Sequence, residues 1–399
     1  MDKKELTYIF GISALLALSF PPFPLGFLVP PALAVFIFFI WESPPKEAFR
    51  RGYWLGLIWG TMTLFWIASS TLTGALFAIT INALHYAIIW WLFVLVKRRS
   101  ILLAFLAFPF FWTGLEFLRL FSDIRFNWIL ISHTQTYYLP FIQHIEITGY
   151  LSLSFMLIVF AELLFLMVYR KGAWRWISPL GIAVPVVLLS LWGIHRIHQL
   201  DKMDFKLVKT GLVQPDVDPF KKWNPDFQDE AFEILMNGGW SLAAGKPDLV
   251  VWPETATPFY LRAHFESIQE IAGLLDSSRM YLLTGTPDYR VAEQQGERDY
   301  HTYNAAFFFR PDTLGFEYYY KMALVPAAES MPFKETFPIL RKLEVGGGDF
   351  FPGKEYKIFK FTIPIRMGRL KNDRYEAWQE FRSTRTEVGL SAIICYESI

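Results

Sequence analysis

Three short segments of the sequence carry residues that together could perform acyl chemistry. Glu254 follows the apolar run 249–252, Lys321 follows three consecutive tyrosines, and Cys395 ends the apolar run 390–394. Cys395 is the only cysteine, so it can form neither an internal disulfide nor a Cys-rich zinc site. A thiol, a carboxylate and an ammonium are suited to nucleophilic attack on an acyl carbon.

The chemistry of these groups predicts a role for each. A thiol attacks only after losing its proton, so Glu254 is the expected general base. The tetrahedral intermediate carries an oxyanion, which Lys321 and a backbone N–H could stabilise. The same carboxylate can then protonate the leaving group. No histidine is required, and the sequence predicts acyl transfer through a thioester on Cys395.

Each segment also has an ordinary structural interpretation. A carboxylate at a strand end is more often a cap or a solvated turn residue. A lysine after an aromatic strand can extend its ammonium into water, and a buried cysteine usually packs as a small hydrophobe. The order of the three residue types along the chain favours the chemical interpretation. The triple glycine at 346–348 lacks a following Lys-Ser/Thr and indicates a flexible loop, not a phosphate-binding loop.

The segments belong to a region whose pattern is typical of an α/β domain. Short runs rich in β-branched and aromatic residues predict strands, and two longer stretches at 226–244 and 259–275 predict helices. The predicted strands are 206–213, 248–252, 280–285, 303–310, 356–363 and 389–395. Glu254 and Cys395 then lie at the carboxyl ends of strands, where ligands bind in open α/β sheets.

The first half of the chain has a different composition. Residues 1–200 hold 14 Lys/Arg and 8 Asp/Glu, whereas residues 201–399 hold 24 and 29. The whole chain is 53% hydrophobic and 19% charged, which excludes a single soluble domain and a disordered chain. Neither half has the basic patch typical of nucleic-acid binding. We expect a membrane domain at 1–198 and an extracytoplasmic domain at 199–399.

Seven apolar stretches predict about seven transmembrane helices in the first half. No small-residue cleavage site follows the first stretch, so a cleaved signal peptide is not expected. The stretches are 6–20, 25–41, 53–72, 74–96, 101–121, 150–169 and 174–194.

The basic residues between these stretches predict the orientation. With the N-terminus inside, the inside segments hold 11 of the 14 basic residues of this half, at 3–4, 46–51, 97–99 and 170–175. An odd number of spans then brings the second half to the outer side of the membrane. Within the spans, Glu116 and Arg119 lie three residues apart on one helical face, and we expect them to pair with each other.

In the segments that contain Glu254, Lys321 and Cys395, the sequence resembles the carbon–nitrogen hydrolase (nitrilase) superfamily. The membrane half of the sequence resembles the apolipoprotein N-acyltransferase family in particular. The resemblance covers essentially the whole chain. In the second half it is carried by Trp252-Pro-Glu254-Thr255, Lys321-x-x-Leu-Val-Pro326 with Glu329, Cys395-Tyr396-Glu397, Gln214 with Lys222-Trp223, and Tyr303-Asn304-Ala305. In the first half it is carried by Trp112, Glu116, Arg119, Trp128 and the stretch 149–155.

The resemblance implies a nitrilase-like αββα sandwich and a role for each matching residue. Glu254 would be the general base, Lys321 would stabilise the tetrahedral intermediates and Cys395 would be the nucleophile. Glu329, Tyr396 and Glu397 would support this triad.

The resemblance also implies the substrates and the cellular location. The acyl donor would be a phospholipid, commonly phosphatidylethanolamine. The acceptor would be the α-amino group of the S-diacylglyceryl cysteine at the N-terminus of an apolipoprotein. No metal or organic cofactor is implied. The enzyme would be a multi-pass protein of the bacterial cell (inner) membrane, with its catalytic domain on the periplasmic or outer side.

The sequence departs from the family pattern in two places. After Pro326 the family usually has Phe-Gly-Glu-Tyr, whereas this chain has Ala-Ala-Glu329-Ser. Family members also continue well beyond the nucleophile, so a sandwich truncated at its C-terminus is expected. Two alternatives therefore remain: a membrane-anchored nitrilase-like amidase, and an inactive truncated membrane protein.

Overall fold

The computed structural model describes residues 2–69, 71–121, 123–218, 221–291, 300–334, 336–337, 339, 349–371 and 374–394, with the backbone alone at 370–371 and 374–383. The chain forms two compact units. One contains Met1–Leu200 and Pro326–Ala328, and the other contains Asp201–Val325 and Glu329–Ile399. Cys395, Tyr396 and Glu397 lie outside the described residues.

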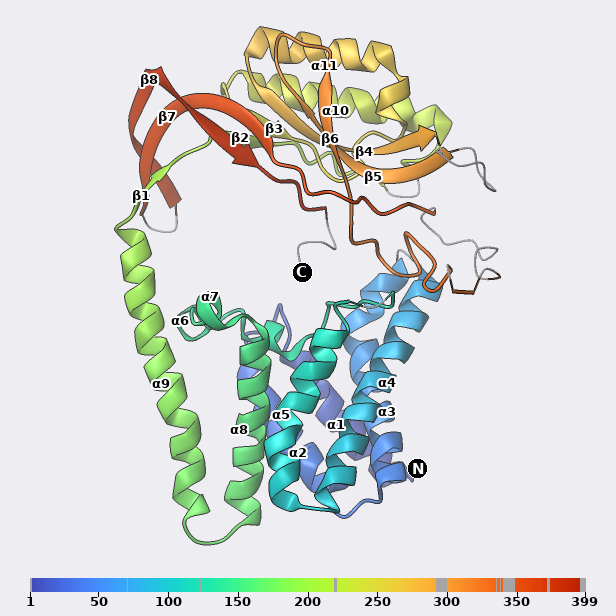
Figure 1. Ribbon diagram of the computed structural model, residues 1–399, viewed down its shortest axis with the longest axis vertical. Coiled ribbons are helices and arrows are strands. Elements are labelled where there is room, and N and C mark those ends of the chain that lie inside the picture. Colours follow the sequence, from blue (N-terminus) through green and yellow to red (C-terminus); the bar gives the residue numbers. More distant parts are fainter. Residues whose placement is uncertain are drawn as a thin grey trace. The chain divides into compact units, whose positions relative to one another are not determined.

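The first unit is helical, and each predicted apolar stretch overlaps a helix of at least 12 residues (Figure 1). These helices are α1 (Lys3–Leu18), α2 (Val29–Ile40), α3 (Pro45–Leu64), α4 (Leu72–Lys97), α5 (Ile101–Leu118), α8 (Leu151–Tyr169) and α9 (Trp174–Asp201). Short elements connect them: η1 (Gly26–Leu28), η2 (Phe65–Ser69), η3 (Ile131–Gln135), α6 (Leu139–Ile142) and α7 (Ile145–Thr148).

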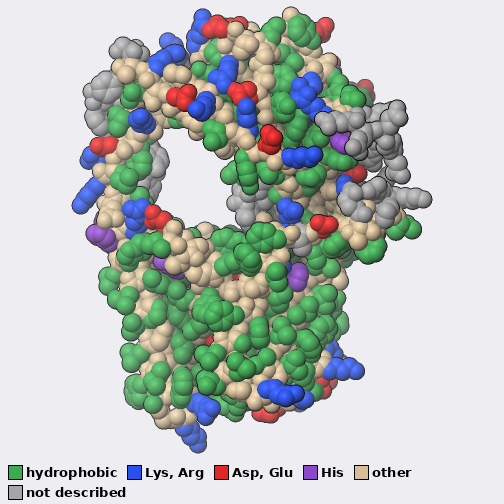
Figure 2. All heavy atoms as spheres, in the orientation of Figure 1, with side chains coloured by type: hydrophobic (Ala, Val, Ile, Leu, Met, Phe, Trp, Pro, Cys, Tyr) green, Lys and Arg blue, Asp and Glu red, His purple; other side chains and the backbone are tan. Residues whose placement is uncertain are grey.

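Among the residues that the structure describes, four helices, α4, α5, α8 and α9, are long and apolar enough to cross a membrane. Helices α1 and α2 have only 16 and 12 residues, and α3 has four charged residues in its first seven. The chain therefore has several candidate spans, and the number seven remains a prediction. Figure 2 shows hydrophobic side chains covering most of the visible surface of this unit, as expected for a lipid-facing surface.

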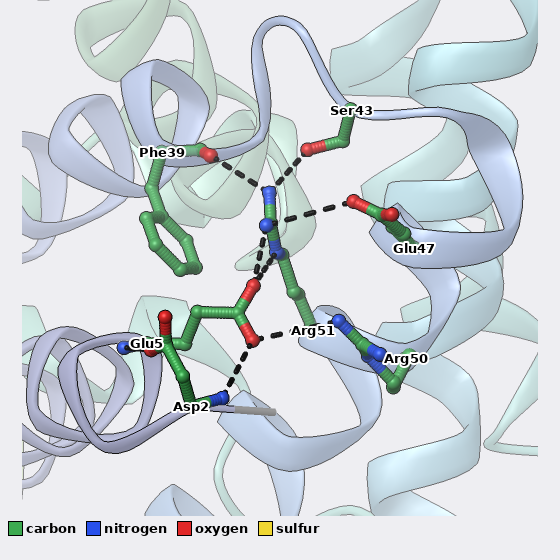
Figure 3. A network of polar contacts seen from close by, with 7 residues as sticks. All are labelled: Asp2, Glu5, Phe39, Ser43, Glu47, Arg50 and Arg51. Atoms are coloured by element: carbon green, nitrogen blue, oxygen red, sulfur yellow. Dashed lines mark hydrogen bonds and ion pairs between the residues drawn. The ribbon is translucent and has the colours of Figure 1, made fainter.

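Charged residues at the starts of α1 and α3 bind one another (Figure 3). The Arg51 guanidinium donates to Glu5 Oε1 at 2.5 Å, to Ser43 Oγ at 2.5 Å and to the Phe39 carbonyl at 3.2 Å. Asp2 caps α1 by accepting from the Glu5 amide at 2.7 Å. Arg51 thus joins the ends of three apolar helices by charge-assisted hydrogen bonds.

The expected pairing of Glu116 with Arg119 is wrong. Glu116 Oε1 instead accepts from Trp112 Nε1 at 3.0 Å and from the Ile131 amide at 3.2 Å. The Arg119 guanidinium donates to the Trp128 carbonyl at 3.2 Å. Both side chains are buried, and each hydrogen-bonds the non-helical segment after α5, whose backbone groups must be satisfied inside the unit.

The second unit is a mixed α/β domain with two sheets. Its strands are β1 (Asp204–Lys206), β2 (Thr210–Leu212), β3 (Leu249–Val251), β4 (Tyr281–Val291), β5 (Tyr300–Phe309), β6 (Phe316–Tyr320), β7 (Phe359–Lys371) and β8 (Arg374–Leu390). One sheet has the order β2-β3-β4-β5-β6, and the other has the order β1-β7-β8. The β2-β3-β4 part is parallel, and the remaining pairs are antiparallel.

Helices and sheets in this unit form three layers. Helices α10 (Gln228–Ala243) and α11 (Phe265–Ser278) cover one face of the five-stranded sheet (Figure 1). Short 3₁₀ turns, η4 (Pro225–Phe227) and η5 (Leu261–Ala263), precede them. On the other face, Phe308 and Tyr319 belong to the same apolar cluster as Phe359 and Phe361 of β7. The helix, sheet, sheet order confirms the predicted mixed α/β domain for the part that the structure describes.

The strand predictions differ from the structure at both ends of the domain. The single strand expected at 206–213 is two short strands, β1 and β2, in different sheets. The strand expected at 389–395 is the end of the long strand β8, which stops at Leu390. The 17-residue sequence of β8 carries many charges, so it lacks the apolar alternation that identifies a half-buried strand.

Candidate active site

Glu254 lies in a tight turn after β3. Gly285 of β4 packs directly against this turn: its amide donates to the Pro253 carbonyl at 3.2 Å, and its carbonyl accepts from the Ala256 amide at 2.8 Å. A Cβ on Gly285 would come within 2.7 Å of Glu254 Cα and within 2.6 Å of the Thr255 amide. Only glycine permits this approach, which fixes the backbone of Glu254 at the end of β3.

Thr255 has a strained backbone. Its φ is +44°, a conformation that costs a β-branched residue roughly 1–3 kcal/mol. The Lys222 ammonium donates to Thr255 Oγ1 at 2.9 Å. Burial lowers the pKa of Lys222, and the neighbouring Glu254 carboxylate acts in the opposite direction. The turn that carries Glu254 is thus held from β4 on one side and by Lys222 on another.

Lys321 follows β6 and is buried. Its amide donates to the Asn304 carbonyl at 2.9 Å, and its side chain is 1% exposed. The ammonium lies 3.2 Å from Glu254 Oε1 and 2.8 Å from Glu329 Oε1. The alternative of a lysine extending into water is therefore wrong. A buried ammonium requires such paired carboxylates, because removal from water is otherwise very costly.

Glu329 is fixed by its own backbone turn. Its Oε2 accepts from the Val325 amide at 2.8 Å, while its amide donates to the Val325 carbonyl at 2.9 Å. The Glu329 side chain is 14% exposed and that of Glu254 is 33% exposed. Glu254 is therefore the more accessible of the two carboxylates, as the group that exchanges protons with a substrate should be.

Asn304 of β5 joins the two carboxylates. Its Nδ2 donates to Glu254 Oε1 at 2.7 Å and to Glu329 Oε1 at 3.0 Å. Asn304 is buried, and its Oδ1 has no hydrogen-bond partner in the described part of the chain. The sequence identified this residue only as part of a family match. The local sequence marks Asn304 only by placing one amide side chain within a largely apolar predicted strand.

The segment before Cys395 enters the core between the two sheets. Ile394 is 6% exposed and belongs to the same apolar cluster as Leu249 of β3 and Tyr319 of β6. Ile393 is 62% exposed, so successive residues point to opposite sides. The residue directly before Cys395 thus packs in the core that also contains the two strands preceding Glu254 and Lys321.

A second polar network lies on the opposite face of β6. Tyr320 precedes Lys321, and strand alternation turns its side chain towards the helical layer. Its hydroxyl donates to Asp288 Oδ2 at 2.7 Å and accepts from Arg290 Nε at 2.8 Å. Arg262 binds Asp288 with two bonds of 2.8 and 2.6 Å. Burial and the bond to Asp288 raise the pKa of Tyr320. This network anchors the strand that carries Lys321.

The described part of the site is an arrangement of acid–base and charged groups. Among the residues described, no three His, Cys, Asp or Glu side chains gather as ligands for a metal ion. With both carboxylates ionised, Glu254, Glu329 and Lys321 carry a net charge of −1. The structure brings these three predicted residues together and adds Asn304 and Lys222.

Two protein families match the chain. The apolipoprotein N-acyltransferase N-terminal domain matches residues 12–163, and the carbon–nitrogen hydrolase domain matches residues 229–399. The apolipoprotein N-acyltransferase of Chlorobaculum tepidum is 28% identical over 96% of this chain and 73% of its own length. That of Geobacter metallireducens is 33% identical over 86% of this chain and 67% of its own length. The chain belongs to the apolipoprotein N-acyltransferase family.

Proposed function

We propose that this chain is an N-acyltransferase that moves an acyl chain from a phospholipid, through a thioester on Cys395, to the α-amino group of an N-terminal S-diacylglyceryl cysteine of apolipoproteins. The observation that carries the proposal is the buried Lys321 ammonium held between Glu254 and Glu329. Family membership supports the lipoprotein acceptor, and the apolar helices support a lipid donor in the same membrane.

In the first half-reaction, Glu254 takes the proton of the Cys395 thiol, and the sulfur attacks the ester carbon of the phospholipid. Lys321 stabilises the negative charge that develops on the carbonyl oxygen. The C–O bond then breaks, and Glu254 returns its proton to the departing alkoxide of the lysophospholipid. Glu329 keeps the Lys321 ammonium in place throughout.

In the second half-reaction, the α-amino nitrogen of the acceptor attacks the thioester carbon. Glu254 takes a proton from this nitrogen, Lys321 again stabilises the oxyanion, and the thiolate leaves and is reprotonated. The N-acyl product and free Cys395 remain. Tyr396 and Glu397 are proposed to support the nucleophile from the following positions.

We infer further that residues 1–198 are the membrane domain and that residues 199–399 work on the outer side of the bacterial cell membrane. The basic residues at 3–4, 46–51, 97–99 and 170–175 support the orientation. An acceptor exported across the membrane would then meet the site on that side.

The test is intact-mass analysis of the protein purified from membranes containing isotopically labelled phosphatidylethanolamine. We expect a hydroxylamine-sensitive acyl adduct on wild-type protein and none on Cys395→Ser. Glu254→Gln should lower the rate of adduct formation by roughly 10²–10⁴-fold, the usual contribution of a general base. Glu270→Gln, on the exposed side of α11, is the matched control and should react like wild type. A folded protein that never acquires the adduct would disprove the proposal.

A further inference from the structure

Lys222 is a second lysine at the site, beyond the Glu, Lys and Cys residues of the proposed mechanism. It lies in the segment after β2, and β2 and β3 are parallel neighbours, so this segment and the Glu254 turn leave the same edge of the sheet. Its side chain is half-buried, and its ammonium donates to Thr255 Oγ1 at 2.9 Å. The ammonium also lies 5.6 Å from the centre of the Trp223 ring.

Lys222 holds the turn at Thr255, whose strained backbone would relax without such a restraint. Thr255 has a φ of +44°, and such a conformation persists only where the surroundings impose it. Gly285 of β4 binds the turn through the Pro253 carbonyl and the Ala256 amide. Among the described contacts, the bond from Lys222 is the one hydrogen bond that another side chain makes to Thr255. Lys222 therefore restrains the residue directly after Glu254.

Lys222 also affects the charge around Glu254. The groups facing this carboxylate are the Lys321 ammonium, the Asn304 amide, and Glu329 beyond them. Lys222 adds a second positive charge on the side of Thr255. Its ammonium interacts electrostatically with Glu254, although the two groups form no direct ion pair among the described contacts. Two cations thus balance the two carboxylates.

We propose that Lys222 is a positioning residue of the active site, which holds Thr255 so that Glu254 faces Asn304 and Lys321. This inference rests on the proposed function of Glu254 as the base for Cys395. It extends that function by assigning a role to the segment between β2 and α10.

The test compares Lys222→Met with Lys221→Met, its exposed neighbour on the same loop. Two rates are measured in the purified protein: single-turnover acylation by labelled phosphatidylethanolamine, and alkylation by iodoacetamide. Alkylation reports on Cys395 alone, since the chain has no other cysteine. Lys222→Arg tests rescue by a second cation, and Thr255→Val removes the hydroxyl that Lys222 binds.

We expect Lys222→Met to slow acylation by roughly tenfold to a hundredfold, the size of effect produced by a small misplacement of a catalytic group. Lys222→Arg should recover most of the rate, and Lys221→Met should match wild type. In the Thr255→Val background, the further loss caused by Lys222→Met should be smaller.

Two results would overturn the inference. One is equal rates for Lys222→Met and Lys221→Met. The other is a slow Lys222→Met protein whose rate Lys222→Arg does not restore and whose loss is just as large in the Thr255→Val background, because that pattern indicates general destabilisation. Failure of the proposed function would look different. The wild-type protein would then not be acylated, while the alkylation rates would still compare the two lysine variants.

Discussion

Lys321 shows how single residues determine the chemistry of this site. Its ammonium is 1% exposed and contacts two carboxylates, so its charge depends on both of them. Asn304 adds a neutral donor that both carboxylates share. An additional negative charge should not be tolerated at this site, because two carboxylates already face one buried ammonium and the three groups carry a net charge of −1.

Asn304→Asp tests this charge balance with almost no change in side-chain shape. A third buried carboxylate should lower the free energy of unfolding by about 3 kcal/mol, as expected for an uncompensated buried charge. Acylation of Cys395 should fall by roughly a hundredfold. Asn224→Asp is the control, since Asn224 caps η4 in an exposed position and aspartate also caps well. Wild-type stability and rate for Asn304→Asp would contradict the account.

The sequence predicted these residues unequally, for a physical reason. Glu254 and Lys321 lie in short motifs at strand ends and were singled out by residue type and chain order, whereas the supporting role of Glu329 was implied only by the family resemblance. Lys222 and Gly285 contact the Glu254 turn from neighbouring strands, and such contacts depend on strand order and register. Neither can be derived from local pattern alone.

Among the secondary-structure elements, strand β6 matters most, because polar networks lie on both of its faces. Lys321 points to the site, whereas Tyr320 binds Asp288 and Arg290 on the helical side. Strand β4 contributes Asp288 to that network and Gly285 to the Glu254 turn. The position of the site therefore depends on the pairing of β4 with β5 and of β5 with β6.

Gly285→Ala should displace the Glu254 turn, because the new Cβ would lie within 2.5 Å of the Pro253 carbonyl oxygen. We expect a loss of about 1–3 kcal/mol in the free energy of unfolding, as for other overpacked sites. Acylation should fall more steeply than stability. Gly273→Ala in α11 has open space and should stabilise the protein by about 0.5–1 kcal/mol. Thermal unfolding and single-turnover acylation are measured for both variants. Equal stability and equal acylation rates for Gly285→Ala and Gly273→Ala would refute this role of Gly285.

Arg262→Met should be strongly destabilising, since it leaves the Asp288 carboxylate, 0% exposed, without its cation. The expected cost is about 3–5 kcal/mol. Arg279→Met removes an ion pair whose two side chains are 66% and 68% exposed, and should cost less than about 1 kcal/mol. Denaturant unfolding of both variants measures the difference. Equal costs would show that the Asp288 network does not anchor β6.

The chain combines a helical unit rich in apolar surface with a mixed α/β domain. The sequence predicted both parts, because hydropathy and period-two patterns are strong local signals. It predicted the boundaries of the β1-β7-β8 sheet poorly, because β8 is long and charged and β1, which pairs with β7, has only three residues. Short polar strands of this kind form only through their partners.

The proposed orientation has a direct test in intact cells. In a Cys395→Ser background, Lys171→Cys lies in the turn between α8 and α9, and Glu230→Cys lies on the surface of α10. A membrane-impermeant maleimide added to spheroplasts should label Glu230→Cys and leave Lys171→Cys unlabelled until the membrane is opened. The reverse pattern would place the α/β domain in the cytoplasm and would exclude exported lipoproteins as acceptors.

The most direct test of the acyltransferase proposal is the fate of the acyl chain. The purified protein, carrying a labelled acyl chain on Cys395, is mixed with a synthetic peptide that begins with S-diacylglyceryl cysteine. The account predicts that the label appears as an amide on the peptide α-amino group and that an N-acetylated peptide accepts none. Release of the label as free fatty acid at the same rate with either peptide would contradict the account and identify the chain as a hydrolase.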